Sequence, residues 1–381
     1  MTRISDLSKD LIEEILSRVP LTSQRVARST CKQWNGLYND ESFTKKHRGK
    51  AANDTMVVMV CDSRVCLVSV DLEGVLKKKQ GLVELSKKLI GQLNHITVSD
   101  VYHCDGLLLC LPKNGMVKSD PVVWNPYLGQ VRWIKPRRKL TILGRYSYCM
   151  GYDDKNNHKI LRFLHHDAGT TVEHEIFNFK SDSWRVLHLT PDWIIPDHRK
   201  GLSLKGNTYL VGMERKLGMR TSLICFDFTS QRFRYCLDLE SNSRKGDSVI
   251  LSSIREEQLA VLFYSGDTCE IEIRITTKIE EANEVTWINF LKVDVKPFGF
   301  SGKFWRFLLY GSFFVDEKKK VALICDNPFS RVYMIGEDNY FKVVAPGEPA
   351  YWRHVCSYNP SSVQIRKGPV YARGKRKIRD C

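Results

Sequence analysis

The 381-residue sequence contains no apolar run as long as the roughly 18–20 residues that a helix needs to cross a lipid bilayer. Its first residues include acidic side chains at Asp6 and Asp10 and no apolar core segment, which is not the pattern of a secretory signal peptide. We therefore expect no membrane partner and a location in the nucleus, the cytoplasm or both.

Paired cysteine motifs are also absent. None of the twelve cysteines belongs to a C-x-x-C pair, and most lie inside apolar runs, as Cys110 and Cys225 do. In a chain without a secretory signal, such thiols are typically reduced and behave as small buried hydrophobic groups. We therefore expect neither a structural disulfide nor a cysteine-based metal site.

The motifs of common catalytic sites are missing as well: there is no G-x-x-x-x-G-K-[ST], no G-x-S-x-G and no H-E-x-x-H. The adjacent acids Asp153 and Asp154 would point to opposite faces of a strand, so they do not form an acid–base pair. The densest group of histidines and acids is interpreted as a polar hairpin, and a metal site is the less favoured alternative. The group consists of His165, His166, Asp167, Glu173, His174 and Glu175. We expect no enzyme activity, no cofactor, no metal and no catalytic residue.

Positive charge is in excess, with 59 Lys and Arg against 43 Asp and Glu and a formal net charge of +16. Residues 366–381 alone hold seven basic side chains and one acidic one. We expect residues 367–381 to form a disordered basic tail. Two basic stretches with aromatic residues, 132–139 and 303–306, are interpreted as solvated turns, with an anion-binding patch as the alternative. Nucleic acid is not the expected partner.

The first fifty residues show helical periodicity. Apolar residues recur at spacings of three and four between residues 5 and 19, which predicts a helix with one apolar face. Ser5 or Ser8 can cap this helix, and Pro20 ends it. Further helices are expected over about 23–35 and 41–47, as read from the sequence. So small a helical unit needs a partner or a larger neighbour to be stable.

The strings LSKDLIEEILSRVPLTS and RSTCKQWNGLYNDESF together resemble an F-box. Ser8 stands where that family usually has proline, and Gln24 and Ala27 stand where leucine-like residues are usual. The resemblance implies an F-box over residues 1–48 that docks on the Skp-type adaptor of SCF ubiquitin ligases, and through it on a cullin. The adaptor-binding residues that it implies are Leu7, Ser8, Leu11, Ile12, Ile15, Leu16, Pro20, Leu21, Cys31, Lys32 and Trp34.

From about residue 55 the pattern becomes one of short strands, and a repeat is visible. The unit is an apolar strand, a polar turn and an aromatic residue that opens the next strand, as in VVWNPYLGQVRWI. Equivalent points lie 56, 53, 49, 47 and 61 residues apart, at Val68, Trp124, Phe177, Phe226, Ile273 and Met334. Steps near fifty residues suit a four-stranded blade of a β-propeller, so we predict about six blades.

The alternative architecture for this region is a pair of face-packed β-sheets. In a propeller, Trp124, Trp184 and Phe226 should be buried in comparable strands, and the ring should close near residues 356–365. The aromatic residues after the turns are expected to fill the space between blades: Trp133, Trp184, Phe233, Trp287 and Phe341.

Motifs spread over this region resemble, in order, the F-box-associated interaction domain of plant F-box proteins; they include CDGLLLC, GYDDKNNHKILRF, EIFNFKSDSWRVL and CSYNPSSVQI. The resemblance implies a substrate-recognition domain over residues 49–366. The expected fold is therefore an α+β multidomain chain: a small N-terminal three-helix F-box followed by an all-β propeller-like domain.

The sequence as a whole favours a non-catalytic substrate-recognition subunit of an SCF-type ubiquitin ligase that recruits an unknown protein. The main alternative is a basic propeller that binds nucleic acid or another polyanion, with purely structural N-terminal helices; a propeller hydrolase is less favoured. The first two differ at the first helix. A docking module should leave Leu11, Ile15 and Leu16 exposed, whereas a structural cap would bury them against the propeller.

Overall fold

The computed structural model of the chain describes residues 7–365 apart from these gaps: 20, 41, 45–54, 78–82, 115–116, 119, 138–144, 167–170, 190–192, 197–199, 215–219, 243–247, 256, 278–285, 299–307, 309–310, 327–330 and 346–351. Pro20, the basic stretch 303–306 and the tail 367–381 thus lie outside the described residues. In the described part, no helix is long and apolar enough to span a bilayer.

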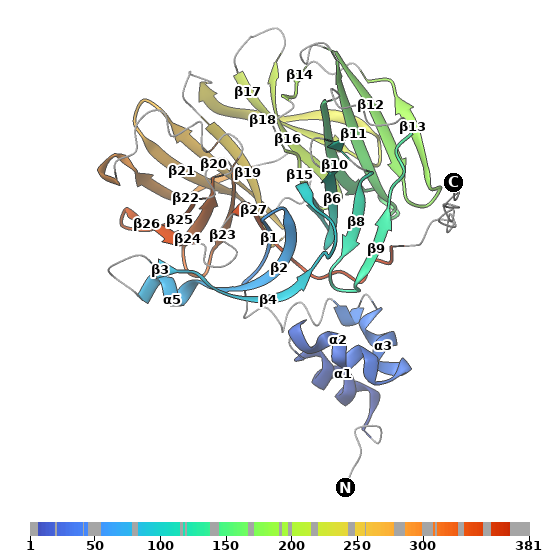
Figure 1. The fold of residues 1–381 in the computed structure, drawn as a ribbon. Coiled ribbons are helices and arrows are strands. Elements are labelled where there is room, and N and C mark those ends of the chain that lie inside the picture. The colour runs from blue at the N-terminus through green and yellow to red at the C-terminus, as the bar shows by residue number, and fades with distance from the viewer. Residues whose placement is uncertain are drawn as a thin grey trace, which may run out of the picture.

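Six sheets, here called blades 1 to 6, surround a common axis (Figure 1). From the axis outwards, blade 1 contains β27 (Trp352–Ser357), β1 (Thr55–Cys61), β2 (Arg64–Asp71) and β4 (Ser86–Gln92). Blade 2 contains β5 (Val98–Cys104), β6 (Leu107–Asn114), β8 (Val122–Asn125) and β9 (Gln130–Trp133), with β7 (Val117–Lys118) beside β6. Blade 3 contains β10 (Arg145–Tyr152), β11 (His158–His166), β12 (Thr171–Asn178) and β13 (Ser183–Leu187).

The other three blades follow the same plan. In blade 4, β14 (Trp193–Ile194) and β15 (Leu202–Leu204) both pair with β16 (Asn207–Glu214), followed by β17 (Arg220–Asp227) and β18 (Arg232–Asn242). Blade 5 contains β19 (Ser248–Ile254), β20 (Gln258–Ser265), β21 (Glu270–Thr276) and β22 (Trp287–Asp294), followed by a short 3₁₀ helix (Lys296–Phe298). Blade 6 contains β23 (Ser312–Asp316), β24 (Val321–Cys325), β25 (Val332–Gly336), β26 (Tyr340–Ala345) and β3 (Val83–Glu84).

The predicted repeat is confirmed at every blade. All six equivalent points are buried and lie on the third strand from the axis: Val68, Trp124, Phe177, Phe226, Ile273 and Met334. Each of the six interblade cores draws side chains from two neighbouring blades, as Val57 of blade 1 and Phe314 of blade 6 do. The apolar faces are therefore covered around a ring, and the alternative of two face-packed sheets is not what the chain forms.

The ring closes by pairing the two ends of the propeller sequence. Strand β27 is antiparallel to β1, with Met59 opposite Val355, so blade 1 is built from both ends of the domain. Val355 is fully buried. The predicted closure is thus confirmed, with β27 ending just within the expected 356–365 segment. A second link joins blades 1 and 6, because the connection after α5 (Leu72–Lys77) places β3 parallel to β26.

The positions of the aromatic residues that follow the turns are predicted less well than the repeat itself. Trp184 lies half-buried in β13, the fourth strand of blade 3, so its predicted equivalence to Trp124 and Phe226 is wrong. The equivalent residue is Phe177, which lies directly opposite Trp184 with ring centroids 5.3 Å apart. Trp133, the last residue of β9, is 53% exposed rather than enclosed between blades. Phe233, Trp287 and Phe341 pack partly buried against interblade cores, as expected.

The described N-terminal residues form α1 (Lys9–Ser17), α2 (Leu21–Thr30) and α3 (Lys32–Tyr38), with residues 42–44 also helical. The predicted single helix over 23–35 is wrong, because Cys31 has an extended backbone (φ −158°) that separates α2 from α3. Figure 1 shows these helices, here called the helical unit, grouped at one side of the propeller near β4 and β9.

Removal of β27 should destabilise the whole propeller. A variant that ends at residue 351 leaves the edge of β1 unpaired and removes the buried Val355 from the core between blades 1 and 6. We expect the melting temperature to fall by about 5 °C or more. A variant that ends at residue 365 keeps every described residue and is the control. Equal melting temperatures for the two variants, measured by circular dichroism, would contradict closure by β27.

Candidate functional site

The helical unit carries an exposed apolar surface on α1. Leu11 is 46% exposed and Ile15 is 41% exposed, whereas Ile12 and Leu16 are only 3% and 2% exposed. The expectation that Leu16 would be exposed is wrong, because Leu16 lies one helical position further round and packs into a core with Tyr38 and Phe43. Helix α1 thus has one apolar face that is covered and a second, formed by Leu11 and Ile15, that is open.

Local interactions fix the start and end of α1. The Ser8 Oγ accepts a hydrogen bond from the Leu11 backbone N–H at 3.3 Å, which satisfies one of the free amide groups of the first turn. Near the C-terminal end, Arg18 is ion-paired with Glu14. The departure at Ser8 from the F-box pattern therefore still supplies a helix cap.

The remaining predicted docking residues do not all lie on this exposed face. Cys31 and Lys32 are exposed at the start of α3, where the Cys31 Sγ accepts a hydrogen bond from the Trp34 backbone N–H at 3.5 Å. Leu7 and Trp34 are half-buried and pack against the helical core. Pro20 and the side chain of Leu21 lie outside the described residues. The structure thus brings only part of the predicted set onto the exposed face.

The covered face of the helical unit packs on the turn between β8 and β9. Tyr127 and Leu128 of this turn are buried in the same core as Ile12, Leu16 and Ala27. The Tyr38 and Tyr127 rings make an edge contact with centroids 6.4 Å apart. Sequence reasoning missed this junction, although two large apolar residues inside a turn are a signal that something covers them.

Polar contacts also join the two parts. The backbone oxygen of Tyr127 accepts hydrogen bonds from Gln24 Nε2 at 3.2 Å and from Arg28 Nη1 at 3.0 Å. Gln24 is buried, as is Ala27, so both departures from the leucine pattern of the F-box face the propeller. The Gln24 side chain makes a hydrogen bond to the Tyr127 turn that a leucine could not make. The small Ala27 side chain packs in the same core as Tyr127.

The turn itself is held by a buried asparagine and by the C-terminal segment. The Asn125 Oδ1 accepts from the Leu128 N–H at 3.0 Å, and its Nδ2 donates to the backbone oxygens of Ser361 and Val363 at 3.0 and 2.9 Å. Gly129 completes the turn with φ +66°, a conformation that favours glycine. The C-terminal segment thus stabilises the turn between β8 and β9, against which the helical unit packs.

The predicted group of histidines and acids is divided among other contacts. Glu175 is fully buried and ion-paired with Arg162, and it also lies 3.5 Å from Arg137. Burial and the nearby His165 lower the pKa of His174 to about 4, so this imidazole stays neutral at physiological pH. Asp167 and the side chain of His166 lie outside the described residues. Within the described part, no three His, Cys, Asp or Glu side chains are placed to hold a metal ion.

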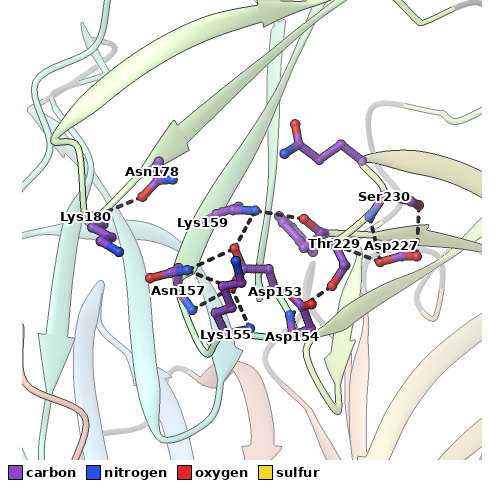
Figure 2. Close-up of polar contacts among 12 residues, drawn as sticks. Asp153, Asp154, Lys155, Asn157, Lys159, Asn178, Lys180, Asp227, Thr229 and Ser230 are labelled. Atoms are coloured by element: carbon purple, nitrogen blue, oxygen red, sulfur yellow. Dashed lines mark hydrogen bonds and ion pairs between the residues drawn. The ribbon is translucent and has the colours of Figure 1, made fainter.

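Asp153 and Asp154 do not act as a pair. Figure 2 shows Asp153 between Lys159 and Asn157, while the backbone N–H of Asp154 reaches Thr229 in the neighbouring blade. The Lys159 Nζ lies 2.9 Å from the Asp153 carboxylate and 2.9 Å from the Phe228 backbone oxygen, so the buried lysine links blades 3 and 4. Burial would raise the pKa of Asp153, but hydrogen bonds from Lys159 and Asn157 outweigh it and lower this pKa to about 2.

A cavity of about 640 Å³ lies between the helical unit and the propeller. Its lining includes Asn39 from the helical unit, Asp105 and Arg255 from propeller turns, and Ser361 from the C-terminal segment. The His158 Nε2 lies 3.4 Å from the Asp105 carboxylate at its wall. Because acids and bases are mixed around the cavity, charge alone selects no class of ligand.

Comparison with known proteins gives matches along almost the whole chain. The F-box domain family matches residues 4–46, and the F-box associated beta propeller domain family matches residues 56–365. The "F-box protein At3g49510" of Arabidopsis thaliana is 43% identical over 395 residues, covering 96% of this chain and all of the relative. The "F-box/kelch-repeat protein At3g13680" of the same plant is 42% identical over 409 residues, covering 99% of each chain.

Truncation of Tyr127 should uncouple the helical unit from the propeller. Tyr127→Ala removes a buried ring from the helical core but leaves the interblade cores intact, so we expect a loss of about 3–5 kcal/mol of helical-unit stability. Limited proteolysis should then cleave the helical unit faster and leave the propeller whole. Tyr235→Ala, which truncates an exposed tyrosine of β18, is the control. Similar proteolysis of both variants would show that the junction does not hold the helices.

The Asp153–Lys159 pair should make stability depend on acid pH. Because folding lowers the pKa of Asp153 from 3.8 to about 2, its contribution is present above about pH 4 and is lost as the pH falls towards 2. Asp153→Asn should therefore cost about 1–3 kcal/mol at pH 7, with a difference from wild type that shrinks on acidification. Urea unfolding at several pH values measures this, and the exposed Asp154→Asn is the control. A pH-independent difference would contradict the ionic role of Asp153.

Proposed function

This chain belongs to the plant F-box proteins that carry an F-box associated β-propeller domain, and we propose that it is a substrate-recognition subunit of an SCF-type ubiquitin ligase. In this proposal the helical unit, with α1 to α3 as the three-helix F-box, docks on a Skp-type adaptor and through it on a cullin. The propeller holds a protein substrate. F-box proteins generally act as such non-catalytic subunits.

The observation that carries the proposal is that α1 has two apolar faces, about 100° apart around the helix, of which one is covered and one is open. Ile12 and Leu16 pack in the core shared with the propeller, so their apolar character is explained by their contribution to the stability of the free chain. Leu11 and Ile15 take no part in that core and remain open to solvent. Val26 on α2 is also exposed. Leu11 and Ile15 are four residues apart and so are neighbours on the helix surface, and exposed neighbouring apolar side chains are typical of an interaction surface.

The rival proposal of purely structural helices accounts less well for the same residues. A helical cap that served only to cover the propeller would turn its apolar stripe towards Tyr127 and leave polar side chains outside. Helix α1 instead divides its stripe between two directions. This division favours a partner on the outer face.

The mechanism that follows is proximity rather than bond making. The adaptor would hold the F-box, the propeller would hold the substrate, and the substrate lysines would meet the ubiquitin-charged enzyme at high effective concentration. The junction at Tyr127 supports this role because it joins the two binding parts through both apolar packing and hydrogen bonds. We further propose that the protein acts in the nucleus, the cytoplasm or both.

Loss of the exposed apolar pair should strongly weaken adaptor binding. Leu11→Ala with Ile15→Ala removes contact area that is worth about 2–4 kcal/mol when covered, which weakens binding about thirty- to a thousandfold. We would coexpress the variant with a plant Skp-type adaptor and measure copurification and the dissociation constant. The melting temperature should remain close to that of the wild type, because neither side chain is buried.

The matched control is Leu89→Ala with Ile288→Ala, which truncates the same residue types at exposed positions on the outer strands of blades 1 and 5. This variant should bind the adaptor like the wild type. If the α1 variant retains wild-type affinity, the proposed docking face is wrong. If the wild-type chain itself binds no Skp-type adaptor, the proposed function is wrong.

A further inference from the structure

We propose that a cavity between blades 2 and 3 binds a small organic anion, a carboxylate or a phosphate ester that carries one apolar group. The cavity, here called the small cavity, has a volume of about 320 Å³. This size is at the lower end of the range of about 300–1,000 Å³ that small-molecule sites occupy. Leu107, Phe179 and the C-terminal segment 363–365 form much of its lining. The proposal concerns the propeller and is independent of adaptor binding.

The charged groups that line the small cavity have one sign. Arg132 of β9, His158 of β11 and Lys180 of the turn between β12 and β13 are basic, and none of the described lining residues is acidic. The remaining polar side chains of the lining are the amides of Asn156, Asn157 and Gln364. Unlike the cavity of about 640 Å³, in which acids and bases are mixed, this one favours a negatively charged ligand.

Arg132 is a buried charge whose hydrogen bonds are incomplete. Its side chain is only 5% exposed, so the interpretation of residues 132–139 as a solvated turn is wrong for this residue. Its Nη2 donates to the Asp182 Oδ1 at 2.5 Å, and its Cζ lies 5.2 Å from the centre of the Phe179 ring. The other two guanidinium nitrogens have no hydrogen-bond partner among the described residues. Because a buried charged donor without a partner is costly, these N–H groups favour an acceptor from outside the chain.

The strand register explains why Arg132 faces the small cavity. Arg132 is opposite Val123 of β8, and Val123 is fully buried in the core between blades 2 and 3. Directly opposite residues of an antiparallel pair share one face of the sheet, so Arg132 also points between these two blades. Trp133, the next residue of β9, points to the other face and is exposed.

The other two basic groups have little compensation from the chain. Lys180 is exposed, and in the described part of the chain its ammonium has no ion-pair partner. The buried His158 Nε2 makes no hydrogen bond to a described residue, and the Asp105 carboxylate lies 3.4 Å from it. Figure 2 shows Lys180 and Asn157 on two turns of blade 3, with Asn157 held by Asp153. The basic groups thus come from separate elements and meet at one cavity.

The apolar part of the lining indicates the second part of the ligand. Leu107 and Ile365 are buried members of the core between blades 2 and 3, and Phe179 and Val363 pack partly buried against it. An inorganic ion would leave these groups in contact with water, whereas an acid with one aromatic or branched aliphatic group would cover them. The charged group would then accept hydrogen bonds from Arg132, since a guanidinium binds carboxylate and phosphate through parallel N–H groups.

The small cavity adjoins the junction with the helical unit. Gln364, which lines the cavity, donates from its Nε2 to the Asn39 Oδ1 at 3.2 Å. The small cavity also shares Asn156, His158 and Val363 with the larger cavity at the helical unit. A bound anion would therefore contact the C-terminal segment that helps to position the helices.

Calorimetric titration of the full chain with three probes tests the proposal. Phenylacetate and phenyl phosphate each carry a charged group on one apolar ring, and phenylacetamide replaces the carboxylate with a neutral amide of similar shape. We expect at least one anion to bind about tenfold or more tightly than the amide, because hydrogen bonds to charged groups are stronger than those between neutral groups. Preference for phenyl phosphate would identify the ligand as a phosphate ester, and preference for phenylacetate would identify it as a carboxylate.

Three variants locate the binding. Arg132→Met keeps most of the side-chain stem and removes the charge, so anion affinity should fall about tenfold or more. Lys180→Met should lower it about two- to fivefold and, because Lys180 is exposed, should leave the melting temperature unchanged. The matched control is Lys155→Met, which removes the same charge from an exposed position in the turn between β10 and β11, outside the lining. This control should bind the anions like the wild type.

Two results would overturn the proposal at the level of the probes: equal affinity for phenylacetate and phenylacetamide, or binding of neither anion. Equal weakening by Lys180→Met and Lys155→Met would show that general positive charge, and not this cavity, attracts the anions. Because Lys180→Met should fold normally, this comparison decides the matter even if Arg132→Met is unstable. Lys180→Met should also copurify with the adaptor like the wild type, so failure of the anion site leaves the proposed function unaffected.

Discussion

The structure depends on one constraint: no blade of this propeller can cover its own two apolar faces. Each of the six interblade cores takes side chains from two blades, so the ring is complete only when β27 pairs with β1. Closure also determines where the chain leaves the ring. Residues 358–365 continue from β27 past Asn125, which binds the backbone of Ser361 and Val363, and Gln364 then reaches Asn39 of the helical unit. The interaction that closes the propeller therefore also helps to position the helices.

The helical unit depends on the propeller to complete its core, because Tyr127 and Leu128, two of the seven buried residues of that core, come from the propeller. A unit of this size cannot enclose Leu16, Tyr38 and Phe43 by itself, and the Tyr127 turn supplies the missing cover. Gln24 and Ala27, which depart from the leucine pattern of the F-box, contact this turn: Gln24 donates a hydrogen bond to it and Ala27 packs against it. Their departure therefore reflects the internal junction, and it does not subtract from the open face formed by Leu11 and Ile15.

The sequence predicts the blades well because each blade repeats one apolar third strand, from Val68 to Met334. Prediction from sequence is wrong where two residues that are adjacent in the chain or across a hairpin have similar side chains. Phe177 and Trp184 are both aromatic and face each other across one hairpin; the repeat places Phe177 correctly on the third strand, whereas the expectation that Trp184 is equivalent to Trp124 rests on its aromatic character alone and is wrong. Ile15 and Leu16 are both aliphatic, and only the position of Tyr127 decides that Leu16 is covered. Long-range packing, which periodicity does not encode, therefore settles the case of Ile15 and Leu16.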